Sequence, residues 1–201
     1  MRQIRLAGGK DKDEISALRV AEFSRSRDFR LLKPHLLNWS DVDDLHPVLG
    51  IWDENNQVVA TLRLIRVDNM ALASEVLEAD LPQDIRFPGL VFNSAATRKS
   101  HRCQGLNQLL RYYAVQSAQA HGMQTLLSPI YQSAPRIAFM KKLGYTCREL
   151  SNTWQTKVVP NSPRVLAALE RETFSGALKI LKDTVPELIK KYPWAGPSIS
   201  L

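Results

Sequence analysis

Cysteine is scarce in this sequence. Cys103 and Cys147 are the two cysteines among 201 residues, too few for a disulfide framework, so a reducing compartment is expected. The chain also lacks an apolar run long enough to span a bilayer, and it lacks the charged start and apolar centre that direct secretion. We therefore expect a soluble cytoplasmic protein without integral membrane association.

Acidic residues are outnumbered by basic ones. The chain has 27 Lys and Arg against 20 Asp and Glu, which gives a formal net charge of +7 at pH 7. This balance favours polyanionic partners, such as anionic lipid, an acidic carrier protein or the phosphates of a small ligand. The basic residues are not interleaved with aromatic ones and no helix-turn-helix pattern is present, so we expect no nucleic acid partner.

The order of the predicted elements indicates an α/β fold (an α+β mixed sheet). A chain of 201 residues fits one domain with a terminal appendage. Alternation predicts strands and helical spacing predicts helices, in an order that suits a twisted sheet with helices on both faces. The predicted strands cover 4–6, 48–52, 57–67, 90–96, 124–130, 145–150 and 153–159. The predicted helices cover 13–26, 29–37, 104–121 and 134–143. Residues 69–79 are predicted as a short helix or a lid, and 38–46 as a loop.

The last part of the chain is predicted to be helical. Pro160 and Pro163 interrupt the sequence, and apolar residues at helical spacing then run through Arg164–Tyr192, with breaks near Gly176 and Pro186. We expect residues 1–159 to form the main domain and residues 160–201 to form a helical extension packed on it. A dimer contact and a membrane-surface contact are the alternatives for this segment.

A glycine turn between a strand and a helix predicts a phosphate site. The strand-like run Leu90–Ala96 is followed by Arg102-Cys103-Gln104-Gly105-Leu106-Asn107 and then by a long helical pattern. Gly105 lets the backbone approach an anion, and the first N–H groups and positive dipole of the helix attract it. Arg98, Lys99 and His101 add donors. The segment therefore predicts a ligand with a pyrophosphate group.

This segment resembles motif A of the GCN5-related N-acetyltransferases, written Q/R-x-x-G-x-G/A. Arg102 and Gly105 match its first and fourth positions, whereas Asn107 departs from the usual Gly or Ala. Downstream, residues 133–145 are similar to motif B of the family, which ends in an aromatic-x-x-x-x-Gly-aromatic pattern, here from Phe139. The resemblance covers roughly residues 45–150.

The resemblance implies the acetyltransferase fold, acyl-coenzyme A as co-substrate and no metal. It implies that amides of motif A hold the pyrophosphate. It also implies that strand 90–96 pairs with the pantetheine and thioester carbonyl, and that it splays from strand 124–130, where Pro129 weakens pairing. The residues implied in coenzyme A binding are Asn93, Ala95, Thr97, Arg98, Arg102, Cys103, Gln104, Gly105, Leu106 and Asn107.

The catalytic acid and base are less clearly marked. Acyl transfer needs one group to take the proton of the amine and another to protonate the leaving thiolate. Many family members carry a tyrosine in motif B where this chain has Met140, whose thioether cannot donate a proton. We expect Met140 to face the sulfur and Tyr131 or Ser133 to be the acid, unless the thiolate leaves without one. The candidate bases are Glu75, which we take first, Asp68, His46 and His101.

A second resemblance concerns the acceptor. Trp39-Ser40-Asp41-Val42-Asp43-Asp44, followed by the strand around Arg63, is similar to the front half of acyl-homoserine-lactone synthases and related N-acyl amino acid synthases. It implies that Asp41, Asp43 or Asp44 holds an ammonium group and that Arg63 holds a carboxylate or organises the cleft. The chain departs from the lactone synthases at Asn93–Ala95, where a Glu-Ser-Arg-like triplet would be expected.

These observations predict an N-acyltransferase. It would move an acyl group longer than acetyl from acyl-coenzyme A or acyl carrier protein to a primary amine, such as an amino-acid-like small molecule. A non-catalytic acyl-coenzyme A sensor and a basic interaction module are the alternatives. The sequence leaves the oligomeric state open, a homodimer included.

Overall fold

A single mixed sheet forms the centre of the protein. The computed structural model describes residues 2–25, 34–132, 134–150 and 163–201. Within these ranges, seven strands lie in the order β1-β2-β3-β4-β5-β7-β6. Neighbouring strands are antiparallel except β4 and β5, which are parallel. The strands are β1 (Gln3–Leu6), β2 (Val48–Trp52), β3 (Val58–Val67), β4 (Gly89–Thr97), β5 (Thr125–Tyr131), β6 (Thr146–Glu149) and β7 (Arg164–Glu170).

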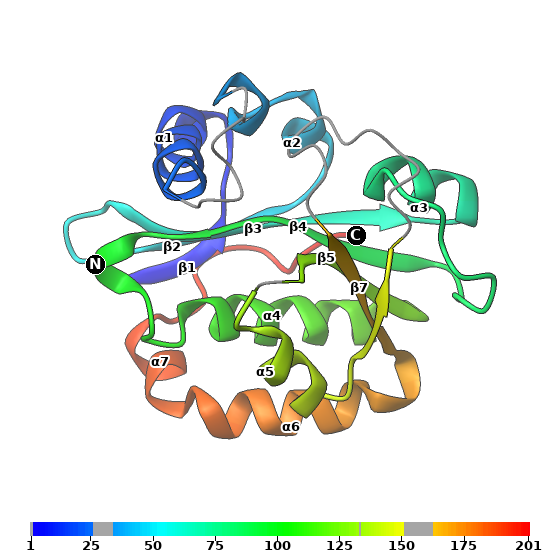
Figure 1. Cartoon of the computed structure of the whole chain (residues 1–201). Coiled ribbons are helices and arrows are strands. Elements are labelled where there is room, and N and C mark those ends of the chain that lie inside the picture. The colour runs from blue at the N-terminus through cyan, green and yellow to red at the C-terminus, as the bar shows by residue number, and fades with distance from the viewer. Residues whose placement is uncertain (1, 26–33, 133, 151–162) are drawn as a thin grey trace.

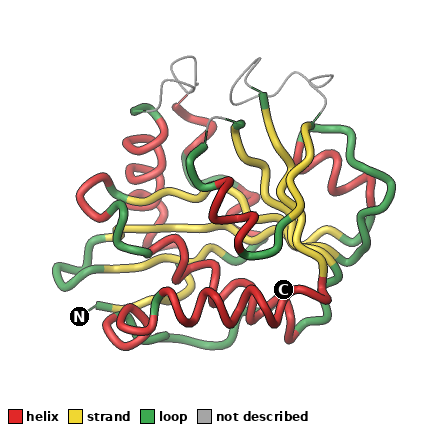
Figure 2. The backbone as a smooth tube through the Cα atoms, turned by 60° about the horizontal axis from the view of Figure 1, so that its bottom comes forward, coloured by secondary structure: helices red, strands yellow, loops and turns green. Residues whose placement is uncertain are grey.

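Helices cover both faces of the sheet, as the sequence predicted (Figure 1). One face carries α1 (Lys12–Phe23), α2 (Asp41–Leu45) and α3 (Met70–Leu77). The other carries α4 (Leu106–Ala120), α5 (Ile137–Lys142), α6 (Phe174–Thr184) and α7 (Pro186–Lys191). Figure 2, turned so that this second face comes forward, shows these helices lying across the strands. Short 3₁₀ turns lie at Gly9–Asp11 (η1), Pro34–Leu37 (η3), Lys99–His101 (η4) and Arg171–Thr173 (η5).

Alternate residues of the central strands bury into different layers, as a pleated strand requires. Leu90 and Phe92 of β4 belong to the core on the α4 side. Val91, between them, belongs to the core on the α3 side. A third cluster packs α1 against Trp52 and its neighbours. Because both faces of β4 and β5 are covered, these strands have near-continuous apolar sequences.

Two predictions of secondary structure are wrong. Residues 38–46 were predicted as a loop, but α2 forms there because Ser40 and Asp43 make a capping box, in which the Ser40 N–H donates to Asp43 Oδ2 at 3.0 Å. The helix predicted from Arg164 begins instead as strand β7, which lies between β5 and β6. Residues 165–169 are apolar and buried on both faces of the sheet, so this unbroken apolar run does not distinguish strand from helix.

The sheet includes a strand later in the sequence than predicted. Strand β7, which lies between β5 and β6, comes after residue 159 in the sequence. The helical extension therefore starts later than predicted, with α6. Arg164 anchors β7 by donating from Nη1 to the Leu77 carbonyl at 2.7 Å and from Nη2 to the Glu78 carbonyl at 2.6 Å. The predicted strand 153–159 and most of the predicted helix 29–37 lie outside the described residues.

The helices that follow β7 pack on the core. Phe174, Ala177 and Leu181 of α6 are buried in the cluster that contains the inner face of α4. Leu188 of α7 packs against the same cluster. These helices therefore support α4 from below the sheet, beside the turn that starts it (Figure 1).

Candidate functional site

An opening lies between β4 and β5. The two strands pair only at Gly89↔Thr125, Leu90↔Leu126 and Val91↔Leu127, and they separate from Phe92 and Ser128 onward. β5 continues along β7, with Pro129 opposite Leu166. Among the described residues, the β5-facing edge of β4 therefore has no strand partner over residues 92–97, and the splay expected from the resemblance is confirmed.

A bulge shapes the open part of β4. Asn93 lies opposite Arg63 of β3 and Ala96 lies opposite Thr61, so two residues of β4 face one residue of β3. Ser94, inside this bulge, has a φ of 50°, and its N–H donates to Asn93 Oδ1 at 2.6 Å. A bulge of this kind reorients backbone groups at the point where pairing ends.

The turn before α4 presents unbonded backbone donors at one end of the opening. Gly105 has a φ of +80° and Cys103 a φ of 60°. The first hydrogen bond of the helix runs from the Leu109 N–H to the Gly105 carbonyl at 2.9 Å. Within the described residues, the N–H groups of 103–108 donate to no protein acceptor. These groups and the helix dipole form a site suited to phosphate.

The arginines expected to hold phosphate already have partners. Arg98 Nη2 donates to the Val58 carbonyl at 2.9 Å. Arg102 Nη2 donates to Glu22 Oε2 at 2.7 Å, and its Nε lies 3.4 Å from the Thr97 carbonyl oxygen. Phosphate binding by Arg98 and Arg102 stays a prediction, and in this conformation the backbone N–H groups are the freer donors.

Three further residues implied in coenzyme A binding lie on the glycine turn and the first turn of α4. Gln104 is exposed, and its Nε2 donates to the Ser100 carbonyl at 3.2 Å. Leu106 is buried and anchors the first turn of α4. Asn107 Oδ1 accepts a hydrogen bond from Arg111 Nε at 3.0 Å, so the motif's unusual last residue is tied to a buried arginine.

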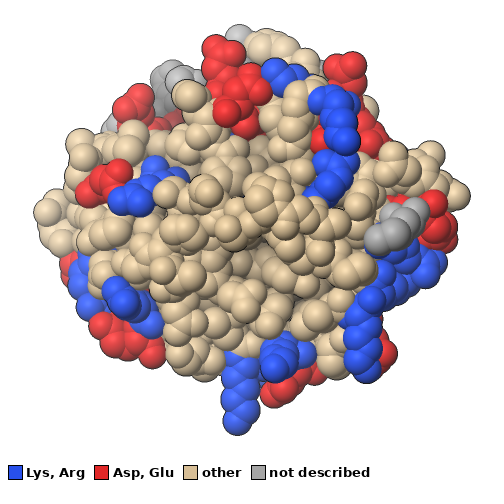
Figure 3. Space-filling view, turned by 180° about the vertical axis from the view of Figure 1, so that it is seen from behind, with Lys and Arg blue, Asp and Glu red and all other residues tan. Residues whose placement is uncertain are grey.

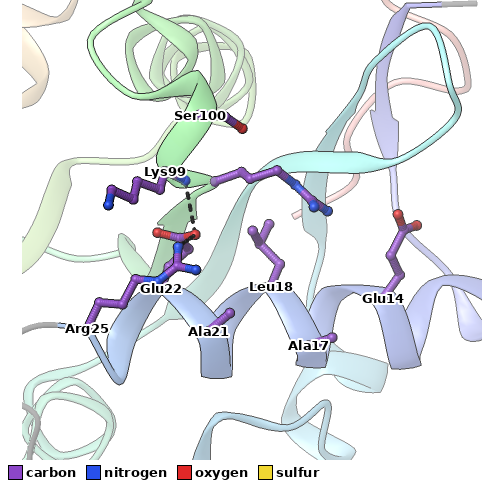
Figure 4. Close-up of a pocket in the computed structure, with 9 residues that line it drawn as sticks. Glu14, Ala17, Leu18, Ala21, Glu22, Arg25, Lys99 and Ser100 are labelled. Carbon is purple, nitrogen blue, oxygen red and sulfur yellow. Dashed lines mark hydrogen bonds and ion pairs between the residues drawn. The ribbon is translucent and has the colours of Figure 1, made fainter.

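A cleft of about 710 Å³ borders this turn on the α1 side (Figure 4). Glu22 lies in its wall with only 4% of its side chain exposed. Its Oε1 accepts from the Lys99 N–H at 3.0 Å and from Arg25 Nη1 at 2.7 Å. The carboxylate of Glu22 thus joins α1 to the turn and pairs with Arg102, one of the cations that the sequence assigned to phosphate.

The structure brings Asp43 and Arg63 together, as part of a buried ion cluster. Arg19 Nη2 lies 2.7 Å from Asp43 Oδ1, and Arg63 Nη1 lies 3.2 Å from Asp43 Oδ2. Burial alone would raise the pKa of Asp43, but the hydrogen bond and charge of Arg19 and the charge of Arg63 outweigh it and hold the pKa below its ordinary value. Asp43 is therefore satisfied by two arginines and positions Arg63.

The remaining acidic residues of this segment differ in exposure and partners. Asp44 pairs with Lys12 at 2.9 Å and accepts from Trp39 Nε1 at 2.8 Å. Asp41 is exposed on α2, and its carboxylate makes no ion pair within the described residues. Of the three aspartates considered for an ammonium group, Asp41 is the one left open.

His46 lies beside this ion cluster at the end of α2. Burial and the charge of Arg63 lower the pKa of His46, against a smaller opposing effect of Asp43. A lowered pKa leaves the imidazole neutral near pH 7, so it can accept a proton. Arg63 is the cross-strand partner of Asn93 in the bulge, which places the cluster next to the open part of β4.

The predicted catalytic residues do not form one group. Glu75 is exposed on α3, and its side chain makes no hydrogen bond or ion pair in the described part of the chain. Tyr131 is half-buried at the end of β5, opposite Arg164. Ser133 lies outside the described residues. Met140 is 1% exposed and packs in the core, so the expectation that it faces the sulfur is wrong.

Sequence reasoning missed two arginines near the opening, the buried Arg111 and the half-buried Arg136. Arg111 projects from the second turn of α4, and Arg136 precedes α5. An arginine next to the apolar stripe of α4 was the available signal, but such residues commonly extend to solvent.

Within the described ranges, no three His, Cys, Asp or Glu side chains gather as metal ligands, and no helix has the length and apolarity needed to cross a membrane.

Comparison with known proteins identifies the family. The model of the Acetyltransferase (GNAT) family matches residues 12–145. The chain belongs to this family. The matched residues include β4 with its bulge, the glycine turn, α4 and β5. No curated protein matches the sequence.

Solved structures share the fold at low identity. An N-acetyltransferase from Staphylococcus aureus Mu50 is 15% identical with a TM-score of 0.60, over 85% of this chain and 99% of that one. The putative acetyltransferase yncA from Salmonella typhimurium, with its cofactor acetyl-CoA, is 17% identical with a TM-score of 0.59, over 85% and 94%. The CoA-dependent acyl-homoserine lactone synthase BjaI, with SAM and isopentyl-CoA, is 17% identical with a TM-score of 0.67, over 98% and 95%.

Proposed function

We propose that this GNAT acyltransferase moves an acyl group from a coenzyme A thioester to the primary amine of an amino-acid-like small molecule. The observation that carries the proposal is the opening between β4 and β5, which ends at the unbonded N–H groups of residues 103–108. The turn would hold the pyrophosphate, and the open edge of β4 would pair with the amides of pantetheine. The thioester would then lie near the bulge at Asn93–Ala95.

We infer that the acceptor approaches from the side of α1 and α2. Arg63 lies opposite Asn93, and Asp43 and Arg19 fix its position. Arg63 would hold the carboxylate of the acceptor, and Asp41 is the open candidate for its ammonium group. The likeness to BjaI supports this class of acceptor, because SAM carries both groups and the likeness covers 98% of this chain.

The amine must lose a proton before or during attack on the thioester carbonyl. His46 is neutral near pH 7 and neighbours Arg63, so we propose His46 as the base or as the group that orients a water. Glu75 stays the alternative that the sequence predicted. The C–S bond of the thioester breaks as the C–N bond forms, and Tyr131 or Ser133 stays the proposed source of the proton for the thiolate.

We propose coenzyme A rather than a carrier protein as the donor. A carrier protein would need a continuous basic surface to dock on. On the face opposite to that of Figure 1, basic side chains lie around the rim, several beside acidic ones, and the centre is uncharged (Figure 3). Two of the similar structures carry acyl-CoA ligands, acetyl-CoA in yncA and isopentyl-CoA in BjaI, which supports a short acyl group.

A binding comparison tests the phosphate site. Gln104→Glu places a negative charge on the turn without changing side-chain size, and Gln116→Glu places the same charge on an exposed position of the same helix. Calorimetry should show weaker binding of coenzyme A to Gln104→Glu but not to Gln116→Glu, with pantetheine binding equal in all three proteins. Equal coenzyme A affinity in both variants would contradict the assignment.

A non-catalytic acyl-coenzyme A sensor is the second candidate. The burial of Met140 favours it, because the position that often carries the catalytic acid holds a core residue. Release of free thiol from acetyl-CoA with a panel of amino acids and amines separates the two functions. Thiol release that depends on an amine supports the enzyme, and binding without release supports the sensor.

A further inference from the structure

Arg111 occupies the point where β4 and β5 separate. Its guanidinium lies 5.3 Å from the centre of the Phe92 ring, and its Nη1 lies 3.4 Å from Ser128 Oγ. Phe92 and Ser128 are the residues that directly follow the last strand pair, Val91↔Leu127. Arg111 is only 2% exposed, so a full positive charge is buried at the apex of the opening.

Arg136, which is half-buried, adds a second cation. Its Nε is buried and makes no hydrogen bond. Burial, together with the nearby charge of Arg111, lowers the pKa of Arg136 to about 10. The hydroxyl of Tyr145 is also buried and lies beside Arg111: burial raises the pKa of Tyr145, and the neighbouring guanidinium of Arg111 opposes that rise. Two cations and a hydroxyl donor therefore face a common region.

No anion of the described protein balances these charges. Arg111 donates to the neutral oxygens of Asn107 and Ser128, and within the described residues no carboxylate forms an ion pair with either arginine. The other buried cations of the site differ: Arg19 and Arg63 share Asp43. A buried cation without a counter-charge is costly, so an anionic ligand would be favoured there.

The pyrophosphate is not that ligand. Arg111 follows Gly105 by six residues, which places it about 9 Å further along the helix axis. If the pyrophosphate lies at the turn, the atoms near the apex belong to the far end of the donor or to the acceptor. The chemical group that fits two arginines and a hydroxyl donor is a carboxylate.

We propose that Arg111 and Arg136, with Tyr145, form a subsite for a substrate carboxylate at the apex of the β4–β5 opening. The inference rests on the proposed function, because it places the thioester in that opening. Two sources supply the same chemistry: the distal carboxylate of a short dicarboxylic acyl group, or a carboxylate of the acceptor, which Arg111 and Arg136 would then hold in place of Arg63. A long apolar acyl chain does not suit this apex, since it would lie against two charges.

The donor arm of the test compares succinyl-CoA with butyryl-CoA. Both acyl groups have four carbons, and only one has the distal carboxylate. If the subsite serves the donor, calorimetry should show succinyl-CoA binding about 10-fold to 100-fold more tightly, as expected for hydrogen bonds to a charged group. The preference should fall to near 1 in Arg111→Met or Arg136→Met and persist in Lys142→Met, which changes an exposed lysine at the other end of α5.

The acceptor arm compares phenylalanine with phenylalaninamide, and glutamate with its α-amide, each titrated into protein saturated with coenzyme A. A preference for the carboxylate that is lost in Arg111→Met or Arg136→Met assigns the subsite to the acceptor. If neither arm shows a preference that depends on Arg111 or Arg136, the inference is overturned, even though coenzyme A binds. If coenzyme A itself fails to bind the folded parent protein, the proposed function fails instead.

The two variants also guard against loss of folding. Replacing a buried, unpaired charge by an apolar side chain of similar length is often neutral or stabilising. Arg136→Met removes no side-chain hydrogen bond within the described residues, whereas Arg111→Met removes those to Asn107 and Ser128. The test therefore stands on Arg136→Met if Arg111→Met does not fold.

Discussion

Gly105→Ala should destabilise the protein through the geometry of the phosphate turn. Gly105 has a φ of +80°, and the left-handed region costs an alanine about 1–2 kcal/mol. The added Cβ would lie 3.0 Å from Leu188 Cδ1 and 3.1 Å from Gln108 Oε1. Both atoms end flexible side chains, so the contacts should add little, and the backbone cost dominates. For a chain of this size the melting temperature should fall by about 2–8 °C.

Gly176→Ala is the matched control. Gly176 lies within α6, and a Cβ built there meets nothing within 4 Å. Alanine in a helix is favoured over glycine by about 0.5–1 kcal/mol, so this change should raise the melting temperature. Thermal unfolding followed by circular dichroism measures both variants. If Gly105→Ala melts at or above the temperature of the parent, the left-handed turn and its packing under α7 are wrong.

Three further changes probe the core and the acceptor side. Met140→Tyr should destabilise by about 1–3 kcal/mol, because a larger polar ring must enter a filled core; a denaturant melt equal to the parent's would mean that the residue faces the cleft after all. Asp43→Asn leaves two buried arginines without a carboxylate and should cost about 3–5 kcal/mol, whereas the exposed Asp41→Asn should cost little. Folding lowers the pKa of Asp43, so the ionised carboxylate stabilises the fold at pH values above the ordinary pKa of an aspartate. This stabilisation is lost as falling pH protonates Asp43. A free energy of unfolding that does not fall at low pH would argue against the cluster. His46→Gln should remove an acid limb of the pH–rate profile that lies below about 6.5, since the pKa of His46 is lowered; an unchanged profile would exclude His46 as the base.

The parts of the fold that the sequence predicted are those with strong local signals. The stripe of α4 and the glycine before it locate the helix and its turn, because a left-handed residue at a helix start favours glycine. The hairpin of β2 and β3 follows from alternation and a polar turn. The splay was inferred from the resemblance, and the pairing of β4 with β5 confirms it.

The parts that the sequence did not predict depend on contacts between distant residues. β7 is a strand because β5 and β6 cover its edges, and its buried sequence carries no alternation that would separate strand from helix. Arg111 lies beside the apolar stripe of its helix, and only the separation of Phe92 from Ser128 shows that its charge is buried. The pairing of Arg102 with Glu22 joins positions 80 residues apart, which no local motif can indicate.

Hydrogen–deuterium exchange with coenzyme A tests the central claim most directly. The claim is that the N–H groups of residues 103–108 and the open edge of β4 hold the ligand. Coenzyme A should slow exchange at residues 92–97 and 103–108 and leave the exposed end of α6 unchanged. Saturation with coenzyme A that leaves exchange at both segments unaltered would contradict the account.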